Sequence, residues 1–423
     1  GHVRGRGWRE RVLCPRVLLR LFAVQVMHGN APCRSLRMRG GLRASVQAYC
    51  NARRRLPVDV LGWLAAALTA QARGRAESWG RWRGHRVLHL DGSGLSMPDT
   101  PALQKTYGQP GRQAPGAGFP VMHVLWLFDA ATGLLVDFVA GKCHTHDLAD
   151  AARLHASMAD GDVLVGDRAF GSFAHLALLL QQNLHGLFRV HQRRVVDFTP
   201  GRAPRHAAPG GRRRGLPPSC RRRTLGPEDQ LVAYPKPATA PSWMSPEQFA
   251  RLPGVITVRT LRYAVDRPGF RTRQVTLVTT LTDPRTYPRQ GLIDLYAARW
   301  QIETNLRHLK QTMRMDVLRC RTPDGVAKEL WMFLIIYNQV RLLMLDAARR
   351  RGVPPDRVSF IDALDALRHR GPAAAAALDL TINPPRPGRH EPRVIKRRKD
   401  RYTYLTRPRQ ELRNAREIAG NAA

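Results

Sequence analysis

The chain has 423 residues, 43% of them hydrophobic, which is enough for two or three domains with substantial cores. Its 69 Lys and Arg residues against 32 Asp and Glu residues give a net charge of +37. Because such a charge opposes compaction unless a polyanion neutralises part of it, nucleic acid is the leading partner. The apolar runs are interpreted as too short or too interrupted for a membrane span, and no signal peptide is recognised.

The first 85 residues are predicted to be mostly helical. Helical spacing of apolar residues occurs over Val12–His28, Ala44–Arg55 and Val58–Arg73. The sequence begins at Gly1 and not at Met, which leaves open whether residues are missing before it.

The next 110 or so residues are predicted to alternate between strands and helices. A strand over Arg86–Asp91 is expected to stop at Gly92. The elements predicted after it are a hairpin of strands Val121–Phe128 and Leu134–Ala140, a helix over His146–Ala159, a buried strand over Asp162–Asp167, a helix over Phe173–Asn183 and a strand over Gly186–His191.

The composition changes at Thr199–Pro227, which is rich in Pro, Gly and Arg and is interpreted as an exposed basic loop or disordered insert. Two strands are predicted to follow, at Val255–Val265 and Arg273–Leu281. The remaining elements are predicted to be a long helix Gln290–Met315, an apolar helix Ala327–Arg349 and a basic tail Pro384–Arg413.

The six cysteines form no CxxC pair and are expected to be free thiols in a reducing compartment. Cys143 is followed by His144, His146 and Asp147. This cluster has two interpretations, a metal site or the caps and turns of a loop.

The segment Tyr296–Lys310 is predicted to be one helix with four polar residues on one face. Arg299, Glu303 and Lys310 lie three, seven and fourteen residues after Tyr296, and these offsets are close to whole helical turns. A carboxylate among cations suits a divalent metal beside phosphodiester oxygens. The alternative is a solvated face with an ion pair between Arg299 and Glu303.

Two aspartates are predicted at strand ends, Asp91 before a Gly-Ser turn and Asp167 before Arg168. Strand ends in an open sheet are common positions for functional sites. Each aspartate alone is more typical of a cap or turn. Together with Glu303 they would hold two hard divalent cations such as Mg²⁺ for an in-line phosphoryl displacement.

These residues resemble the IS-four family of cut-and-paste DDE transposases. The resemblance rests on Asp91-Gly-Ser, on Gly166–Gly171 and on the spacing of Tyr296, Arg299, Glu303 and Lys310, and it spans roughly residues 25 to 415. It implies an RNase H-like α/β core with a mixed sheet, a mostly β insertion between the second Asp and the Glu, and a helical N-terminal region. The implied domains are a DNA-binding region at 1–85, a catalytic core at 86–195 and 284–372, an insertion at 196–283 and a basic tail at 373–423.

The resemblance also implies the roles of individual residues. Asp91, Asp167 and Glu303 would be catalytic and would bind two Mg²⁺ ions, with Mn²⁺ as a substitute. Contacts with DNA are expected from Tyr296, Arg299, Arg307, Lys310 and Arg168. The implied partners are double-stranded DNA, both transposon inverted repeats and target, and a second copy of the chain when DNA is bound, with no membrane. The implied location is the nucleoid in a prokaryotic cytoplasm.

The implied reaction is cleavage of each transposon end, passage through a DNA hairpin and strand transfer into a target. The base at the hairpin has three candidate stacking partners, Trp243, Phe270 and Tyr263, and a core role is the alternative for each. Two other functions stay open: a DNA-binding remnant or repressor of the same element that does not turn over, and a nuclease of the same fold that does not transpose.

Overall fold

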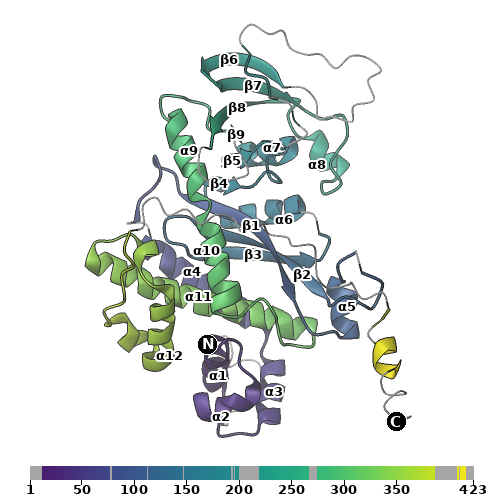
Figure 1. Cartoon of the computed structure of the whole chain (residues 1–423), viewed down its shortest axis with the longest axis vertical. Coiled ribbons are helices and arrows are strands. Elements are labelled where there is room, and N and C mark those ends of the chain that lie inside the picture. The colour runs from purple at the N-terminus through teal and green to yellow at the C-terminus, as the bar shows by residue number, and fades with distance from the viewer. Residues whose placement is uncertain are drawn as a thin grey trace.

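The computed structural model describes residues 12–76, 79–111, 113–145, 147–191, 194, 196–199, 219–265, 274–385, 407–408 and 410–415. Phe270, His146 and most of the predicted basic loop and basic tail lie outside these ranges. In the described part, the strands form one sheet of nine in the order β3-β2-β1-β4-β5-β9-β8-β7-β6 (Figure 1).

The first five strands form one half of this sheet, which corresponds to the predicted core. Strands β1 (Val87–Ser96), β2 (Val121–Asp129) and β3 (Leu135–Lys142) are antiparallel neighbours. Strands β4 (Val163–Gly166) and β5 (His185–Arg189) run parallel to β1. Three antiparallel strands followed by two parallel ones, with helices on the faces, form the RNase H-like core that the sequence predicts.

Strand β1 is longer than predicted. It continues through Gly92 to Ser96 because its antiparallel pairing with β2 extends to Ser96 opposite Val121. Its parallel pairing with β4 ends at His89. Asp91 therefore lies inside a strand, but at the mouth of the sheet on the side of β4.

The other four strands come from the region between Asp167 and Glu303. They are β6 (Cys220–Gly226), β7 (Asp229–Pro235), β8 (Val255–Ala264) and β9 (Gln274–Thr279). Because β9 pairs with β5, these strands continue the core sheet. The interpretation of Thr199–Pro227 as loop is wrong for β6, an exposed edge strand with three arginines, which lacks the apolar alternation that marks a strand in sequence.

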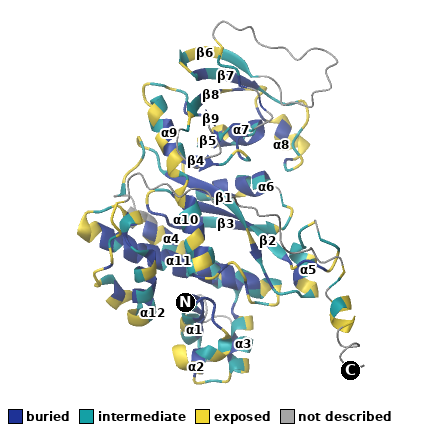
Figure 2. Ribbon diagram, in the orientation of Figure 1, coloured by how far each residue is buried: buried dark blue, intermediate teal, exposed yellow. Residues whose placement is uncertain are grey.

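Period-two alternation separates the two faces of the central strands. Leu88, Leu164 and Phe188 belong to a core that includes α6 (Asp147–Leu154) and α7 (Phe173–Gln181). Val87, Val165 and Leu187 belong to a core on the opposite face, which is covered by α9 (Arg289–Ala298). Figure 2 shows the central strands buried and the outer helices exposed on their outward sides.

A third core joins β2 to the helices in the lower half of Figure 1. Its centre is α11 (Pro323–Arg351), which packs against α1 (Pro15–Met27), α4 (Val58–Ala76) and α12 (Phe360–Ala376). By length and hydropathy α11 could cross a membrane, so the statement that the apolar runs are too short is wrong for this helix. Its most apolar window is 78% buried within the protein, as in the core helix of a globular domain.

Glu329 on α11 connects the N-terminal helices to the segment that precedes α11. One carboxylate oxygen accepts a hydrogen bond from the Asn30 amide at 3.1 Å. The other accepts the backbone N–H groups of Arg319 at 3.0 Å and Cys320 at 3.1 Å. The side chain is fully buried, so these three hydrogen bonds take the place of hydrogen bonds to water.

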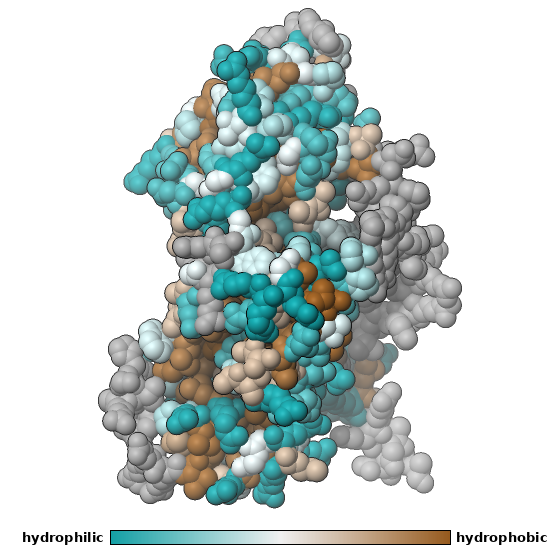
Figure 3. Space-filling view, turned by 90° about the vertical axis from the view of Figure 1, so that its left-hand side faces the viewer, coloured by the Kyte–Doolittle hydropathy of each residue, from teal (hydrophilic) through white to brown (hydrophobic). Residues whose placement is uncertain are grey.

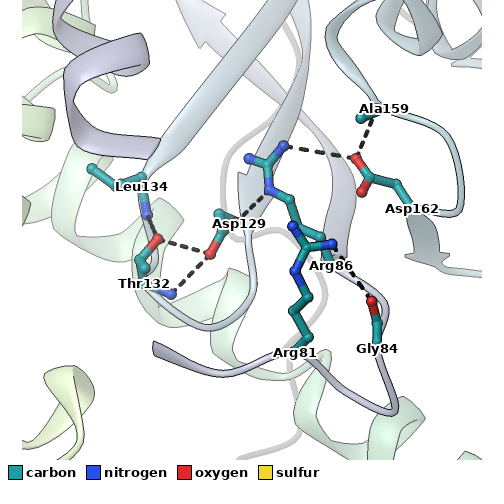
Figure 4. A network of polar contacts seen from close by, with 8 residues as sticks. All are labelled: Arg81, Gly84, Arg86, Asp129, Thr132, Leu134, Ala159 and Asp162. Atoms are coloured by element: carbon teal, nitrogen blue, oxygen red, sulfur yellow. Dashed lines mark hydrogen bonds and ion pairs between the residues drawn. The ribbon is translucent and has the colours of Figure 1, made fainter. Parts of the chain in front are cut away.

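A polar network lies at the end of the sheet where β1 begins (Figure 4). Arg86 donates to Asp129 at 2.8 Å and lies 3.7 Å from the Asp162 carboxylate. A cavity of about 400 Å³ lies beside this network. The carboxylates of Asp129 and Asp162 are buried and face the Arg86 guanidinium, so their charge is balanced within the protein.

Among the described residues, His89, His155 and His175 are buried, and burial lowers the pKa of each. Burial lowers the pKa of His155 to about 4 and that of His175 to about 3. The Nε2 atoms of these two rings are 3.0 Å apart, so protonating both would place two donors face to face.

This burial predicts acid sensitivity. The unfolded chain takes up protons from about pH 6.5 and the folded chain only near pH 4, so stability is intact above 6.5 and falls as the pH drops between these values. The loss is up to about 1.4 kcal/mol per pH unit for each histidine. Thermal unfolding across this range should show it, with a shallower dependence for His155→Gln. The exposed His369→Gln is the control, because it changes no buried ring, and equal slopes for all three proteins would contradict the account.

Candidate active site

Alternate residues of three parallel strands bring acidic and basic side chains to one end of the sheet. His89, Val165 and Leu187 are in register across β1, β4 and β5. Side chains two residues further along point to the same face, which is the one covered by α9. These next residues are Asp91, Asp167 and Arg189.

Local backbone features fix the two aspartates. The Asp91 carboxylate accepts the Gly92 N–H at 2.9 Å, and Asp167 accepts the Ala169 N–H at 2.7 Å. Gly92 has no room for a side chain, because a Cβ there would lie 2.9 Å from Nε2 of His123 on β2. His123 is held in turn by an ion pair with Asp147 at 3.0 Å.

The groups that shift the pKa of Asp91 indicate which charged residues lie near it. Burial raises the pKa of Asp91 to about 6, the Arg299 guanidinium and the Gly92 N–H lower it, and the carboxylates of Asp167 and Glu303 raise it further. Two acidic residues that are far from Asp91 in sequence, Asp167 and Glu303, therefore act on it electrostatically. The catalytic role of these three residues stays a prediction.

The prediction of one continuous helix over Tyr296–Lys310 is wrong. Helix α9 ends at Ala298, α10 spans Gln301–Arg307, and His308–Thr312 is a π-helix. The joint at Arg299 and Trp300 is a tighter turn, in which the N–H groups of Arg299 and Ile302 donate to carbonyls three residues earlier. Side-chain offsets of a regular α-helix therefore do not apply across the whole segment.

Two of the predicted DNA-contacting residues lie beside the carboxylates. The Arg299 guanidinium is 5.7 Å from the centre of the Tyr296 ring. Burial raises the pKa of Tyr296, the guanidinium groups of Arg299 and Arg189 lower it, and Asp167 raises it. Tyr296 thus lies within electrostatic reach of Asp167, and Arg299 within reach of Asp91.

The other three predicted contacts are placed differently. Lys310 donates to the Gly94 carbonyl at 3.0 Å, further along β1 from Asp91. Burial lowers its pKa. Arg168 and Arg307 are exposed side chains next to Asp167 and on α10. Sequence reasoning missed Arg189, although counting two residues past Leu187 along the parallel strand would have found it.

The carboxylates suit a divalent metal by their chemistry. Carboxylate oxygens are the ligands that Mg²⁺ prefers. Burial is the main cause of the raised pKa of Asp91, and the carboxylates of Asp167 and Glu303 add to it, so a cation would stabilise the charged form. Within the described ranges, however, no three His, Cys, Asp or Glu side chains are close enough to hold a metal ion. The carboxylates are chemically suited to Mg²⁺, but among the described residues their side chains are not grouped closely enough to surround one ion.

The remaining sequence candidates take ordinary places. Trp243 packs against the core beside α8 (Pro246–Ala250), and Tyr263 packs against the core under α9. His144 contacts the Gln109 carbonyl at 3.2 Å, as expected of a loop. All six cysteines are free thiols. Stacking of a DNA base on Trp243 or Tyr263 stays a prediction.

Comparisons with known proteins give the family. Residues 82–339 match the transposase DDE domain family. The chain is 27% identical over 362 residues to the transposase InsG for insertion sequence element IS4 of Escherichia coli (strain K12), which covers 81% of this chain and 74% of that protein.

Two solved structures are also similar. The piggyBac transposase synaptic complex with hairpin DNA has a TM-score of 0.44 and 11% identity, covering 88% of this chain and 74% of that one. The Mos1 transposase paired-end complex with the left transposon end has a TM-score of 0.17 and 14% identity, covering 43% and 60%. By its sequence match, the chain belongs to the transposase DDE domain family and is an IS4-family DDE transposase.

Proposed function

We propose that Asp91, Asp167 and Glu303 hold two Mg²⁺ ions and that the protein cleaves the ends of its insertion sequence and joins them to target DNA. The observation that carries the proposal is that Asp167 and Glu303 both raise the pKa of Asp91, which supports three carboxylates near one end of the sheet. When bound, the ions would activate the attacking hydroxyl and stabilise the leaving oxygen.

The chain's own residues would bind and orient the DNA. Arg299 offers planar paired donors to a phosphodiester, and Tyr296 supports its guanidinium. Trp300 is 49% exposed beside them, and Lys310 would hold the strand further along β1. The net charge of +37 supports the binding of long stretches of DNA. Two copies of the chain on paired ends are part of the proposal.

The proposed reaction has four stages. Water attacks a phosphodiester at the transposon end, breaking the P–O3′ bond and leaving a 3′-OH on the transposon and a 5′-phosphate on the flanking DNA. That 3′-OH attacks the phosphodiester of the opposite strand, which closes a hairpin and breaks the P–O3′ bond to the flanking DNA, so the flanking DNA leaves with a 3′-OH. Water then opens the hairpin, restoring the 3′-OH of the transposon and leaving a 5′-phosphate. The restored 3′-OH finally attacks a target phosphodiester, and the P–O3′ bond broken there leaves a 3′-OH on the target. The six free thiols are compatible with our placing this reaction at the nucleoid in a prokaryotic cytoplasm.

Metal removal tests the proposal. On labelled DNA carrying both inverted repeats, the protein with Mg²⁺ should produce nicks, hairpins and strand-transfer products. EDTA should reduce all three to background and added Mg²⁺ should restore them, while DNA binding persists in EDTA. Cleavage that resists EDTA would contradict metal dependence. Binding without any cleavage would indicate a repressor, and cleavage without joining would indicate a nuclease.

A further inference from the structure

Arg189 ends β5 at the same level at which Asp167 follows β4. Gly166 pairs with Phe188, so Asp167 and Arg189 are the next residues on neighbouring parallel strands. Neighbouring strands are about 4.8 Å apart, which places the two backbones side by side. By alternation from Leu187, the Arg189 side chain points to the face that α9 covers.

The turn after Asp167 is packed against this strand end. A Cβ at Gly171 would lie 3.1 Å from the Arg189 carbonyl oxygen and 3.3 Å from the Val278 side chain. A larger residue at position 171 would push the turn away from β5. The glycine therefore helps to keep Asp167 and Arg189 next to each other.

Two arginines approach Tyr296 from different elements. Arg299 comes from the joint between α9 and α10, and Arg189 comes from the sheet. Both guanidinium groups act on the Tyr296 hydroxyl, as does the Asp167 carboxylate. The tyrosine thus lies within electrostatic reach of two cations from different elements.

Arg189 differs from the structural arginines of the same sheet. Arg259 on β8 donates to Asp229 and to the Tyr287 carbonyl, and Arg86 is paired with Asp129. For the partly exposed Arg189 side chain, the described part of the chain shows neither a hydrogen bond nor an ion pair. Its donors remain available to a ligand from outside.

We propose that Arg189 and Arg299 grip the same phosphodiester of the bound DNA end, one from the sheet and one from the helix. The proposal rests on the proposed function, because it requires DNA in this site. Two planar guanidinium groups, one from the sheet beside Asp167 and one from the helix, would fix the strand that enters between Asp167 and the helix. A single arginine would leave that strand free to pivot.

The test is DNA binding in EDTA, so cleavage does not enter it. The probe is a duplex ending in the inverted repeat that flanks the gene. Arg189→Gln should weaken binding roughly tenfold or more and make the logarithmic salt dependence shallower by about one phosphate contact. Arg189→Lys should keep the salt dependence but bind less tightly, since it loses the paired donors. Arg351→Gln, an equal loss of charge at the exposed end of α11, is the matched control.

A scan with neutral methylphosphonates locates the contact. At one position, replacing the phosphate should abolish the effects of both Arg189→Gln and Arg299→Gln. If no position does so for both, or if Arg189→Gln behaves like Arg351→Gln, the proposal is overturned. The scan measures binding and needs no catalysis. If variants of the three carboxylates still cleaved DNA, the proposed function would be refuted, but the result of the scan would still stand.

Discussion

Asp91→Asn should abolish cleavage, lowering its rate by about a thousandfold or more, while DNA binding in EDTA stays close to that of the original protein. The amide keeps the shape of the carboxylate but removes a charged metal ligand. The same variant should be more stable by about 1–2 kcal/mol, because a neutral group escapes the burial and repulsion that raise the pKa of Asp91 to about 6. Opposite changes in activity and stability are expected only of a functional carboxylate.

Cleavage assays and thermal unfolding of the same preparations measure both effects. Asp167→Asn and Glu303→Gln should lose cleavage to a similar extent, because residues that act as one unit are not additive. Asp160→Asn, an exposed aspartate at the opposite edge of the sheet, is the control and should retain both properties. Full cleavage by any of the three variants would remove that residue from the site.

Glu329→Ala should lower the free energy of unfolding by about 3–5 kcal/mol, the largest effect expected outside the candidate site. The substitution leaves the Asn30 amide and the N–H groups of Arg319 and Cys320 without their acceptor in a fully buried position. It also removes a carboxylate that, after Cys320 and Tyr49, helps to raise the pKa of the half-buried Arg53. Glu329→Gln should cost less, about 1–2 kcal/mol, because the amide oxygen can keep part of the network.

Urea denaturation monitored by tryptophan fluorescence measures this loss as a lower midpoint. Asp379→Ala is the control: its carboxylate pairs with Arg351 on the surface and is 71% exposed, so the midpoint should barely move. A Glu329→Ala midpoint equal to that of the control would show that the three donors find water or other partners.

The sequence predicts the core strands well because their signals are local. Buried runs such as Val163–Gly166 and the hairpin of β2 and β3 carry apolar residues and turn residues in the expected order. Asp167 could be found from its place after a strand, whereas Asp91, which lies inside β1, and Glu303, which lies on α10, depend on the resemblance to a family. By contrast, the extension of β1 depends on β2, which lies far along the chain, and Gly92 alone suggests a stop.

The break between α9 and α10 could not be read from periodicity. Arg299 and Trp300 both keep helical backbone angles, and the change is in which carbonyl each N–H reaches. The π-helix that follows shifts Lys310 toward Gly94. Spacing thus identifies the residues of the site, whereas contacts with the sheet decide where each side chain lies.

The pairing of β5 with β9 bears on how this protein could change length over evolution. Phe188 and Val278 are direct neighbours, although the chain between them makes a long excursion. The pairing of β5 with β9 therefore closes the loop between them, whatever segments that loop contains. Each doubling of that excursion would add only about 0.6 kcal/mol of closure entropy. Related chains can thus gain or lose segments there while Asp167 and Glu303 stay the same distance apart.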